Sequence, residues 1–125
     1  MVNKKVLTAA LVVLLSLGGL PAQSHSQLVD ASPRPNTTLT TSPRQVLLTF
    51  NEELIDLGGK SNVITVTNAR NQRVAVGQTV VASNQLSASF SRNLAVGRYT
   101  VWWRAVSADG HPISGKYRFS ITKRR

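Results

Sequence analysis

The sequence predicts an all-β fold, either an antiparallel β-sandwich or a barrel, of about seven strands. Short runs rich in β-branched residues recur along the chain, and Pro, Asn, Gly and Ser separate them. No long segment shows the period of about 3.6 residues that is typical of an amphipathic helix. The expected strands cover residues 26–31, 45–51, 62–67, 73–81, 85–90, 98–106 and 116–122.

Turn-forming residues mark where these strands begin and end. Ser32-Pro33 ends the first run, and Ser42-Pro43 precedes the second. A turn at Asn68–Asn71 leads into the fourth run, and Ser83-Asn84 separates the fourth from the fifth. Gly97 introduces the sixth run, which is the strongest strand of the chain.

The last two expected strands each carry an apolar face that is suited to a core. Alternate side chains of a strand point to opposite faces of the sheet. One face of 98–106 therefore carries Tyr99, Val101, Trp103 and Ala105, and one face of 116–122 carries Tyr117, Phe119 and Ile121. Trp103 is expected in the core, whereas Trp102 lies on the opposite face and covers the outside of the sheet or a partner surface.

Residues 1–24 have the layout of a secretory signal peptide. Lys4 and Lys5 supply a positive start, residues 6–20 are largely apolar, and 21–24 offer small residues before a cut after Ser24. The apolar run is shorter than the roughly 20 residues of a membrane-spanning helix, although an uncleaved anchor is the alternative. We therefore expect a periplasmic or otherwise extracytoplasmic mature domain, 25–125, with no transmembrane anchor after processing.

Composition narrows the function classes. The chain has no cysteine, which excludes thiolate metal sites, redox pairs and cysteine nucleophiles. Its net charge is +10, of which Lys4 and Lys5 contribute two. Apart from residues 123–125, the basic residues are scattered singly, so a solvated surface facing anionic envelope material is favoured over nucleic-acid binding. We expect a monomer.

Two histidines occupy positions where metal ligation is easy. His25 would be the first residue of the mature chain, so that its α-amine and its imidazole Nδ1 can chelate one metal ion. The amine has a reference pKa of about 7.7–8.0, so losing its proton costs little near neutral pH. His111 adds a third nitrogen, and Asp109 or Glu52 adds a carboxylate oxygen. Such an N,O set suits Cu(II), and we expect one ion per chain.

A purely structural interpretation of these residues stays open at this point. Asp109-Gly110 is a favourable turn pair and Pro112 stiffens the exit of the loop, so that the segment could be only a tight connection. A histidine beside a cleavage point could likewise be incidental.

Nearly all of the mature chain resembles the CopC family of exported copper-resistance proteins. The most specific similarity is the block 94–115, which holds Trp102-Trp103 and Asp109-Gly110-His111-Pro112. Further matching segments are His25 with Leu28-Val29 and Ser32-Pro33, the strand 46–52 that ends in an acidic residue, and Phe119 in the last strand.

The resemblance implies a Greek-key β-sandwich of the cupredoxin-like or immunoglobulin-like kind. It also implies a Cu(II) site made by His25 with its amine, His111, Asp109 and the acidic residue Glu52. In the family pattern the two histidines do most of the binding, and Asp109 acts as a weak ligand or orients the imidazole. Some members carry a methionine-rich Cu(I) site, but the single methionine here is Met1, so we expect a Cu(II)-only form.

Three functions follow from these observations. The first is an exported, non-enzymatic Cu(II) carrier or buffer in copper resistance or homeostasis, which passes copper to a separate membrane transporter. The second is a copper-dependent oxidase with an amino-terminal histidine site, which the nearby carboxylate and the small domain disfavour. The third is an adhesion module that binds no metal.

Overall fold

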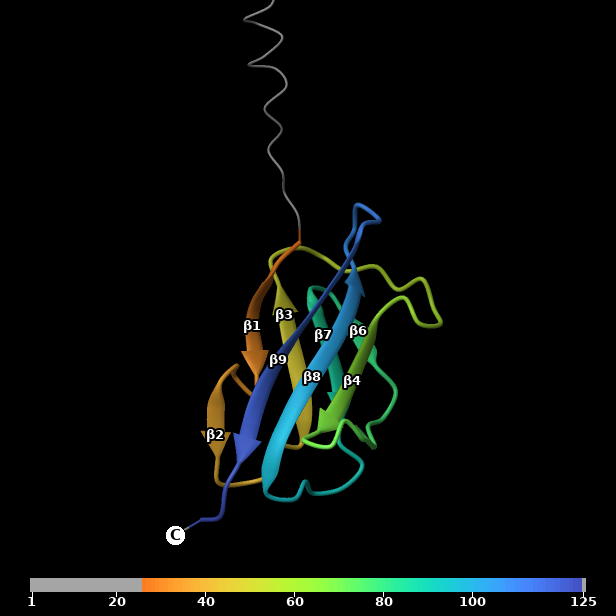
Figure 1. Cartoon of the computed structure of the whole chain (residues 1–125). Coiled ribbons are helices and arrows are strands. Elements are labelled where there is room, and N and C mark those ends of the chain that lie inside the picture. The colour runs from red at the N-terminus through yellow and green to blue at the C-terminus, as the bar shows by residue number, and fades with distance from the viewer. Residues whose placement is uncertain (1–25, 125) are drawn as a thin grey trace, which may run out of the picture.

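The computed structural model describes residues 26–124, and in this part of the chain two β-sheets pack face to face (Figure 1). The strands are β1 (Leu28–Ser32), β2 (Thr37–Leu39), β3 (Gln45–Phe50), β4 (Val63–Asn68), β5 (Arg73–Val74), β6 (Val80–Ala82), β7 (Gln85–Ser89), β8 (Gly97–Val106) and β9 (Pro112–Ile121). The predicted all-β sandwich is confirmed.

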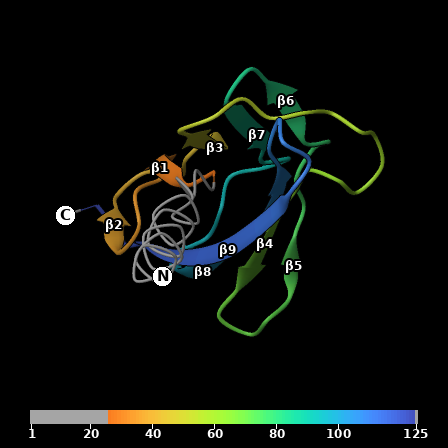
Figure 2. The ribbon, with the colours of Figure 1, turned by 90° about the horizontal axis from the view of Figure 1, so that it is seen from above.

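The sheets differ in size and contain strands from different parts of the sequence. One has the order β1-β3-β7-β6, and the other has the order β2-β9-β8-β4-β5. The view from above shows them as two layers, with the long strands β8 and β9 on one side and β1 and β3 on the other (Figure 2). Consecutive strands from β1 to β4 alternate between the two sheets, and the chain changes sheet again after β5 and after β7, so the connections pass repeatedly between the layers.

The core lies between the layers and follows the alternation of the sequence. In β3, Val46, Leu48 and Phe50 are fully buried, and in β8 the same holds for Val101. The rings of Tyr99 and Phe119 stack with centroids 5.4 Å apart. The faces predicted for the last two strands are thus confirmed. Residues 26–124 contain both sheets and this core, so a chain that begins at His25 holds the whole described domain.

The prediction of one continuous strand over residues 73–81 is wrong, because the chain crosses from one sheet to the other within this range. β5 pairs with β4, through Val66 and Val74, whereas β6 pairs with β7 in the other sheet. Between them the amide of Gly77 donates a 2.7 Å hydrogen bond to Ser89 O. Val74 and Val76 both pack against the core, so the alternation continues through the crossing and conceals it in the sequence.

The antiparallel expectation fails at one edge of the larger sheet. β2 pairs with β9 in parallel, with Thr37 opposite Phe119. Its three residues are too few to show a pattern, and no strand was expected there. β9 also begins at Pro112 rather than at Lys116, because Gly115 continues the strand instead of breaking it.

The predicted signal peptide lies outside the described residues. Within 26–124 no helix is long and apolar enough to cross a membrane.

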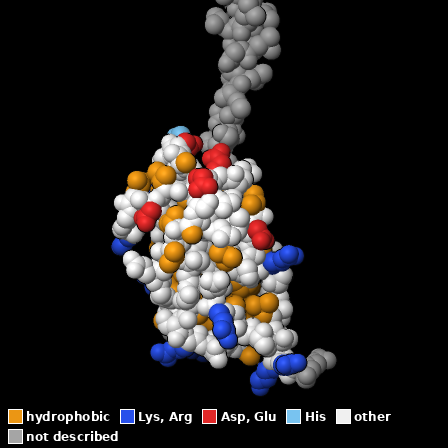
Figure 3. All heavy atoms as spheres, turned by 180° about the vertical axis from the view of Figure 1, so that it is seen from behind, with side chains coloured by type: hydrophobic (Ala, Val, Ile, Leu, Met, Phe, Trp, Pro, Cys, Tyr) orange, Lys and Arg blue, Asp and Glu red, His pale blue; other side chains and the backbone are white. Residues whose placement is uncertain are grey.

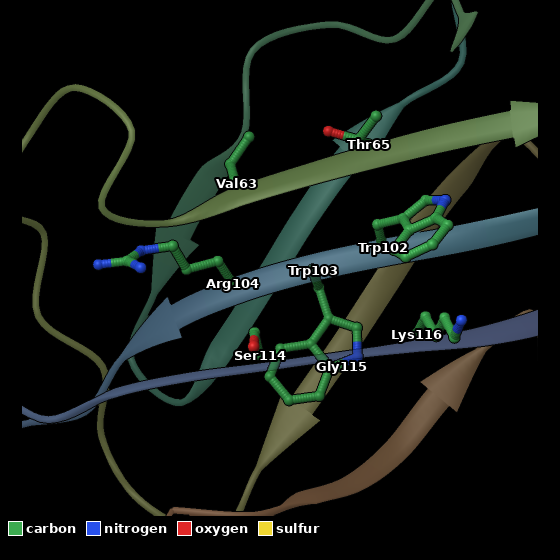
Figure 4. Close-up of a pocket in the computed structure, with 8 residues that line it drawn as sticks. All are labelled: Val63, Thr65, Trp102, Trp103, Arg104, Ser114, Gly115 and Lys116. Atoms are coloured by element: carbon green, nitrogen blue, oxygen red, sulfur yellow. The ribbon is translucent and has the colours of Figure 1, made fainter. Parts of the chain in front are cut away.

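A close approach of β8 and β9 explains the glycine inside the last strand. Trp103 lies opposite Gly115 in the ladder, and its ring meets Phe50 edge to face at 5.2 Å. A Cβ atom at position 115 would lie 2.6 Å from Cζ2 of Trp103. Figure 4 shows the indole of Trp103 reaching β9 at Gly115, while Trp102 lies over β8. Only glycine therefore fits at 115 without displacing the indole.

We predict that Gly115→Ala lowers the free energy of unfolding by about 1–3 kcal/mol, because the added methyl group forces Trp103 away from Phe50. Thermal and urea unfolding followed by circular dichroism measure the change. Ser114→Ala, at the exposed neighbouring position, is the control and should leave stability nearly unchanged. Equal stability of the two variants would contradict this packing.

Candidate metal centre

At one end of the sandwich, three segments that are far apart in sequence are joined by hydrogen bonds. The amide of Asn51, just after β3, donates to Gln27 O at 3.0 Å, and the amide of Gln27 donates back to Asn51 Oδ1 at 2.7 Å. Two residues further, Glu53 O accepts a 2.9 Å bond from the amide of Ala108. Figure 1 shows the start of the described chain and the β8–β9 connection at this same end.

The β8–β9 connection is a tight turn around Asp109-Gly110. The amide of Gly110 donates to Ser107 O at 2.8 Å, and the amide of Ser107 donates to His111 O at 3.2 Å. Gly110 has a φ of 86°, which favours glycine. An isolated bridge between Leu54 and Ser107 fixes the base of the turn. The turn predicted from Asp109-Gly110 is present, and it presents two functional side chains.

Asp109 is joined to His111 by two hydrogen bonds within the turn and to Ser107 by a third. Its Oδ2 lies 3.0 Å from Nδ1 of His111, and its Oδ1 accepts the backbone amide of His111 at 3.0 Å. The same Oδ1 accepts a short hydrogen bond from Ser107 Oγ. The bond from Ser107, followed by those from the side chain and amide of His111, holds the pKa of Asp109 well below its usual range.

This arrangement assigns different roles to the two residues. The side chain of His111 is 71% exposed, so it is accessible to an ion from solution. Both oxygens of Asp109 already accept hydrogen bonds within the turn. A carboxylate that holds one imidazole nitrogen fixes the tautomer and the orientation of the ring. The geometry thus favours Asp109 as the residue that orients His111.

The other two predicted ligands are Glu52, which the structure describes, and His25, which it does not. Glu52 is half-buried in the bend after β3, and its neighbour Glu53 instead accepts a 2.8 Å bond from Ser83 Oγ. Within residues 26–124 no three His, Cys, Asp or Glu side chains gather into a metal-binding group, so Glu52 is not brought together with Asp109 and His111. His25 lies outside the described residues, although Gln27, two positions later, is bonded to Asn51.

Negative charge gathers around this end. Figure 3 shows Asp and Glu side chains mostly toward the upper end of the molecule and Lys and Arg mostly toward the lower end. Of the five acidic residues, Glu52, Glu53, Asp56 and Asp109 belong to the two segments that meet at this end. Such a charge distribution raises the local concentration of cations.

Two residues that support the turn, Ser107 and Glu53, were not predicted from the sequence. Ser107 is buried and supplies the hydroxyl that Asp109 accepts. Its place two residues before an aspartate was the available signal, because Ser and Asp in turns bond to nearby groups. The role of Glu53 rests on its backbone carbonyl, which no side-chain pattern reveals.

We predict that the Asp109 carboxyl in the metal-free protein titrates below its ordinary value of 3.8. A carboxyl whose pKa is lower in the folded chain stabilises the fold above its unfolded pKa, and this stabilisation is lost as the pH falls through the folded pKa. The turn should therefore persist at pH 4 and loosen only at lower pH, as carboxyl carbon shifts in NMR spectra would report. Ser107→Ala removes the largest cause and should raise the pKa. Titration at or above 3.8 in the unsubstituted protein would contradict this network.

Most of the described chain matches a known protein family. A family profile described as the CopC domain matches residues 28–122. The chain is similar to copper resistance protein C of Xanthomonas campestris pv. juglandis, with 30% identity over 94% of this chain and 96% of that protein. It is also 36% identical over 90% of its length to copper transport protein CutJ of Bacillus subtilis, of which it spans 21%.

Solved structures show the same fold. The crystal structure of CopC from Methylosinus trichosporium OB3b superposes with a TM-score of 0.70 and 30% sequence identity. The superposition covers 81% of this chain and 97% of that one.

Proposed function

Because the chain belongs to the CopC family, whose members are copper-binding proteins and not enzymes, we propose that it binds one Cu(II) ion outside the cytoplasm and acts as a carrier or buffer in copper resistance. The observation that carries the proposal is the Asp109–His111 pair, with Nδ1 and Oδ2 3.0 Å apart, on a turn bonded to the segment after β3. The oxidase alternative has no support in a family of non-enzymes.

The proposed ligands are the amine and imidazole of His25, Nε2 of His111, and a carboxylate oxygen of Glu52. Asp109 engages Nδ1 of His111, which makes Nε2 the ligating nitrogen. Two residues of chain span at most about 7 Å. The bonds between Gln27 and Asn51 therefore limit how far His25 can lie from the start of the bend that carries Glu52. The amine is a ligand only if export removes residues 1–24.

The donor set favours Cu(II) over Cu(I). Imidazole, amine and carboxylate suit Cu(II), whereas Cu(I) prefers thiolate and thioether sulfur. The chain has no cysteine, and its one methionine is Met1. The acidic residues around the site add a field that attracts a divalent cation. The turn is held in place by its own hydrogen bonds, so that little ordering accompanies binding.

We further propose that the protein works in the periplasm or an equivalent compartment and passes copper to a separate membrane transporter. The similarity to CutJ, which is named a copper transport protein, supports this link. The chain corresponds to 21% of that longer protein, so the transport step would fall to a separate protein. The exposed position of His111 suits transfer, because a partner's ligand can approach the ion directly. We propose that the carrier is a monomer.

The amine ligand is tested by Cu(II) titration against a competing chelator. Protein that begins at His25 is compared with protein that keeps Ser24 in front of it. Losing the amine should weaken Cu(II) binding by about 100-fold or more, since even changes outside the ligand set cost 10–100-fold. The circular dichroism spectra of the two proteins should be identical. Equal affinities would overturn the amine-ligated site.

The remaining ligands are tested by substitution in the chain that begins at His25. His111→Ala should weaken Cu(II) binding by about 100-fold, whereas an adhesion module with incidental histidines would bind copper unchanged. Glu52→Gln should weaken binding about tenfold, and Glu53→Gln is its control of equal charge. Equal losses in the two glutamine variants would mean that Glu52 acts through the acidic field and not as a ligand.

A further inference from the structure

The outer face of the larger sheet carries positive charge without any negative partner. None of the strands β2, β4, β5, β8 and β9 contains an Asp or Glu residue. The residues of β8 and β9 that alternate with the buried core positions include Arg98, Arg104, Lys116 and Arg118, all exposed. The side chains on this face therefore need partners other than carboxylates of their own sheet.

One of these cations has a partner on the face. The ammonium of Lys116 lies 4.8 Å from the centre of the Trp102 ring, and the indole N–H of Trp102 donates to Thr67 Oγ1 at 3.0 Å. Figure 4 shows these two side chains on neighbouring strands. Trp102 is 41% exposed. The indole of Trp102 thus provides Lys116 with an uncharged partner.

Arg98 and Arg118 have no such partner. No hydrogen bond or ion pair joins either guanidinium to another described residue. Arg118 lies opposite Thr100 in the ladder, and Arg98 precedes Thr100 by two residues on β8. The two arginines are therefore diagonal neighbours on one face, about 7–8 Å apart at their Cα atoms. Like charges at this spacing repel each other unless an anion lies between them.

A polar hollow lies between these arginines and the β4–β5 turn. It has a volume of about 220 Å³ and is lined by Asn68, Ala69, Asn71, Arg98, Thr100 and Arg118. Asn68 Oδ1 accepts the amides of Arg70 and Gln72, at 2.9 and 3.0 Å, which fixes the turn. Asn71, held with a φ of 60°, completes the rim with an amide that can donate.

We propose that this hollow binds a phosphate group. Two guanidinium groups offer paired N–H donors that match phosphate oxygens, and the hydroxyl of Thr100 and the amide of Asn71 add neutral donors. The phosphate belongs either to a free phosphate ion or to the headgroup of an anionic lipid. Because β8 runs from this hollow to the Asp109–His111 turn, a bound headgroup leaves the metal centre at the far end from the lipid.

The first arm of the test is titration with inorganic phosphate, at constant ionic strength set by chloride, of the chain that begins at His25. Amide shifts in NMR spectra should saturate for residues 68–72, 98–100 and 118. The double variant R98Q/R118Q should bind at least about tenfold more weakly, because each charge-assisted hydrogen bond contributes substantially. R34Q/R44Q removes the same charge from exposed arginines elsewhere and is the control.

The second arm is co-sedimentation with phosphatidylglycerol vesicles, with phosphatidylcholine vesicles as the uncharged comparison. Loss of binding in R98Q/R118Q but not in R34Q/R44Q supports the hollow and assigns its ligand to the lipid. Arginine-dependent binding of free phosphate alone assigns it to the free ion. If neither arm shows a difference between the two double variants, the proposal is overturned. Cu(II) affinity should be the same in both variants, so failure here is separate from failure of the copper site.

Discussion

The candidate metal centre depends on the backbone hydrogen bonds of the segment that follows β3. Asn51 is bonded to Gln27, near the start of the domain, and Glu53 O accepts the amide of Ala108 in the β8–β9 turn. These two attachments join the start of the described chain to the turn that carries His111, although the segments are more than 70 residues apart in the sequence. Since the bonds involve mainly backbone groups, the proximity depends on the sandwich itself, and the side chains remain available for chemistry.

The same end of the molecule combines a prearranged turn with negative charge, while the outer face of the larger sheet is positive. Asp109 orients His111 through the imidazole and through the backbone amide, so the ring needs little reorganisation to bind an ion. The acidic residues attract a divalent cation to this end. The unpaired arginines at the other end of β8 face a hollow that suits phosphate. The chain is strongly basic overall. One end of the sandwich nevertheless presents carboxylates, which suit a cation, and the other end presents guanidinium groups, which suit an anion.

The sequence predicted most of the fold because alternation reports directly which residues are buried. Tyr99, Val101, Phe119 and Ile121 are buried as expected. The pattern failed at 73–81, because Val74 and Val76 keep the alternation while the chain changes sheets, and at β2, which is too short to show a period. For the site, Asp109 and His111 were predicted together and lie in contact. Ser107 bonds to Asp109 only two residues later, so its contribution was visible in the sequence, whereas that of Glu53 depends on a tertiary contact. The place of Glu52 relative to the turn depends on a connection that sequence spacing does not determine.

The central claim is that one Cu(II) ion is held jointly by the mature amino terminus and the β8–β9 turn. Electron paramagnetic resonance of the copper-loaded chain that begins at His25 tests this most directly, because nitrogen ligands split the Cu(II) signal. Labelling all histidines with ¹⁵N identifies the couplings that come from histidine nitrogens, and His111→Ala removes the imidazole of one residue. The account predicts coupling to both imidazoles and to the His25 amine, with one imidazole lost in the variant. A spectrum that His111→Ala leaves unchanged would contradict it.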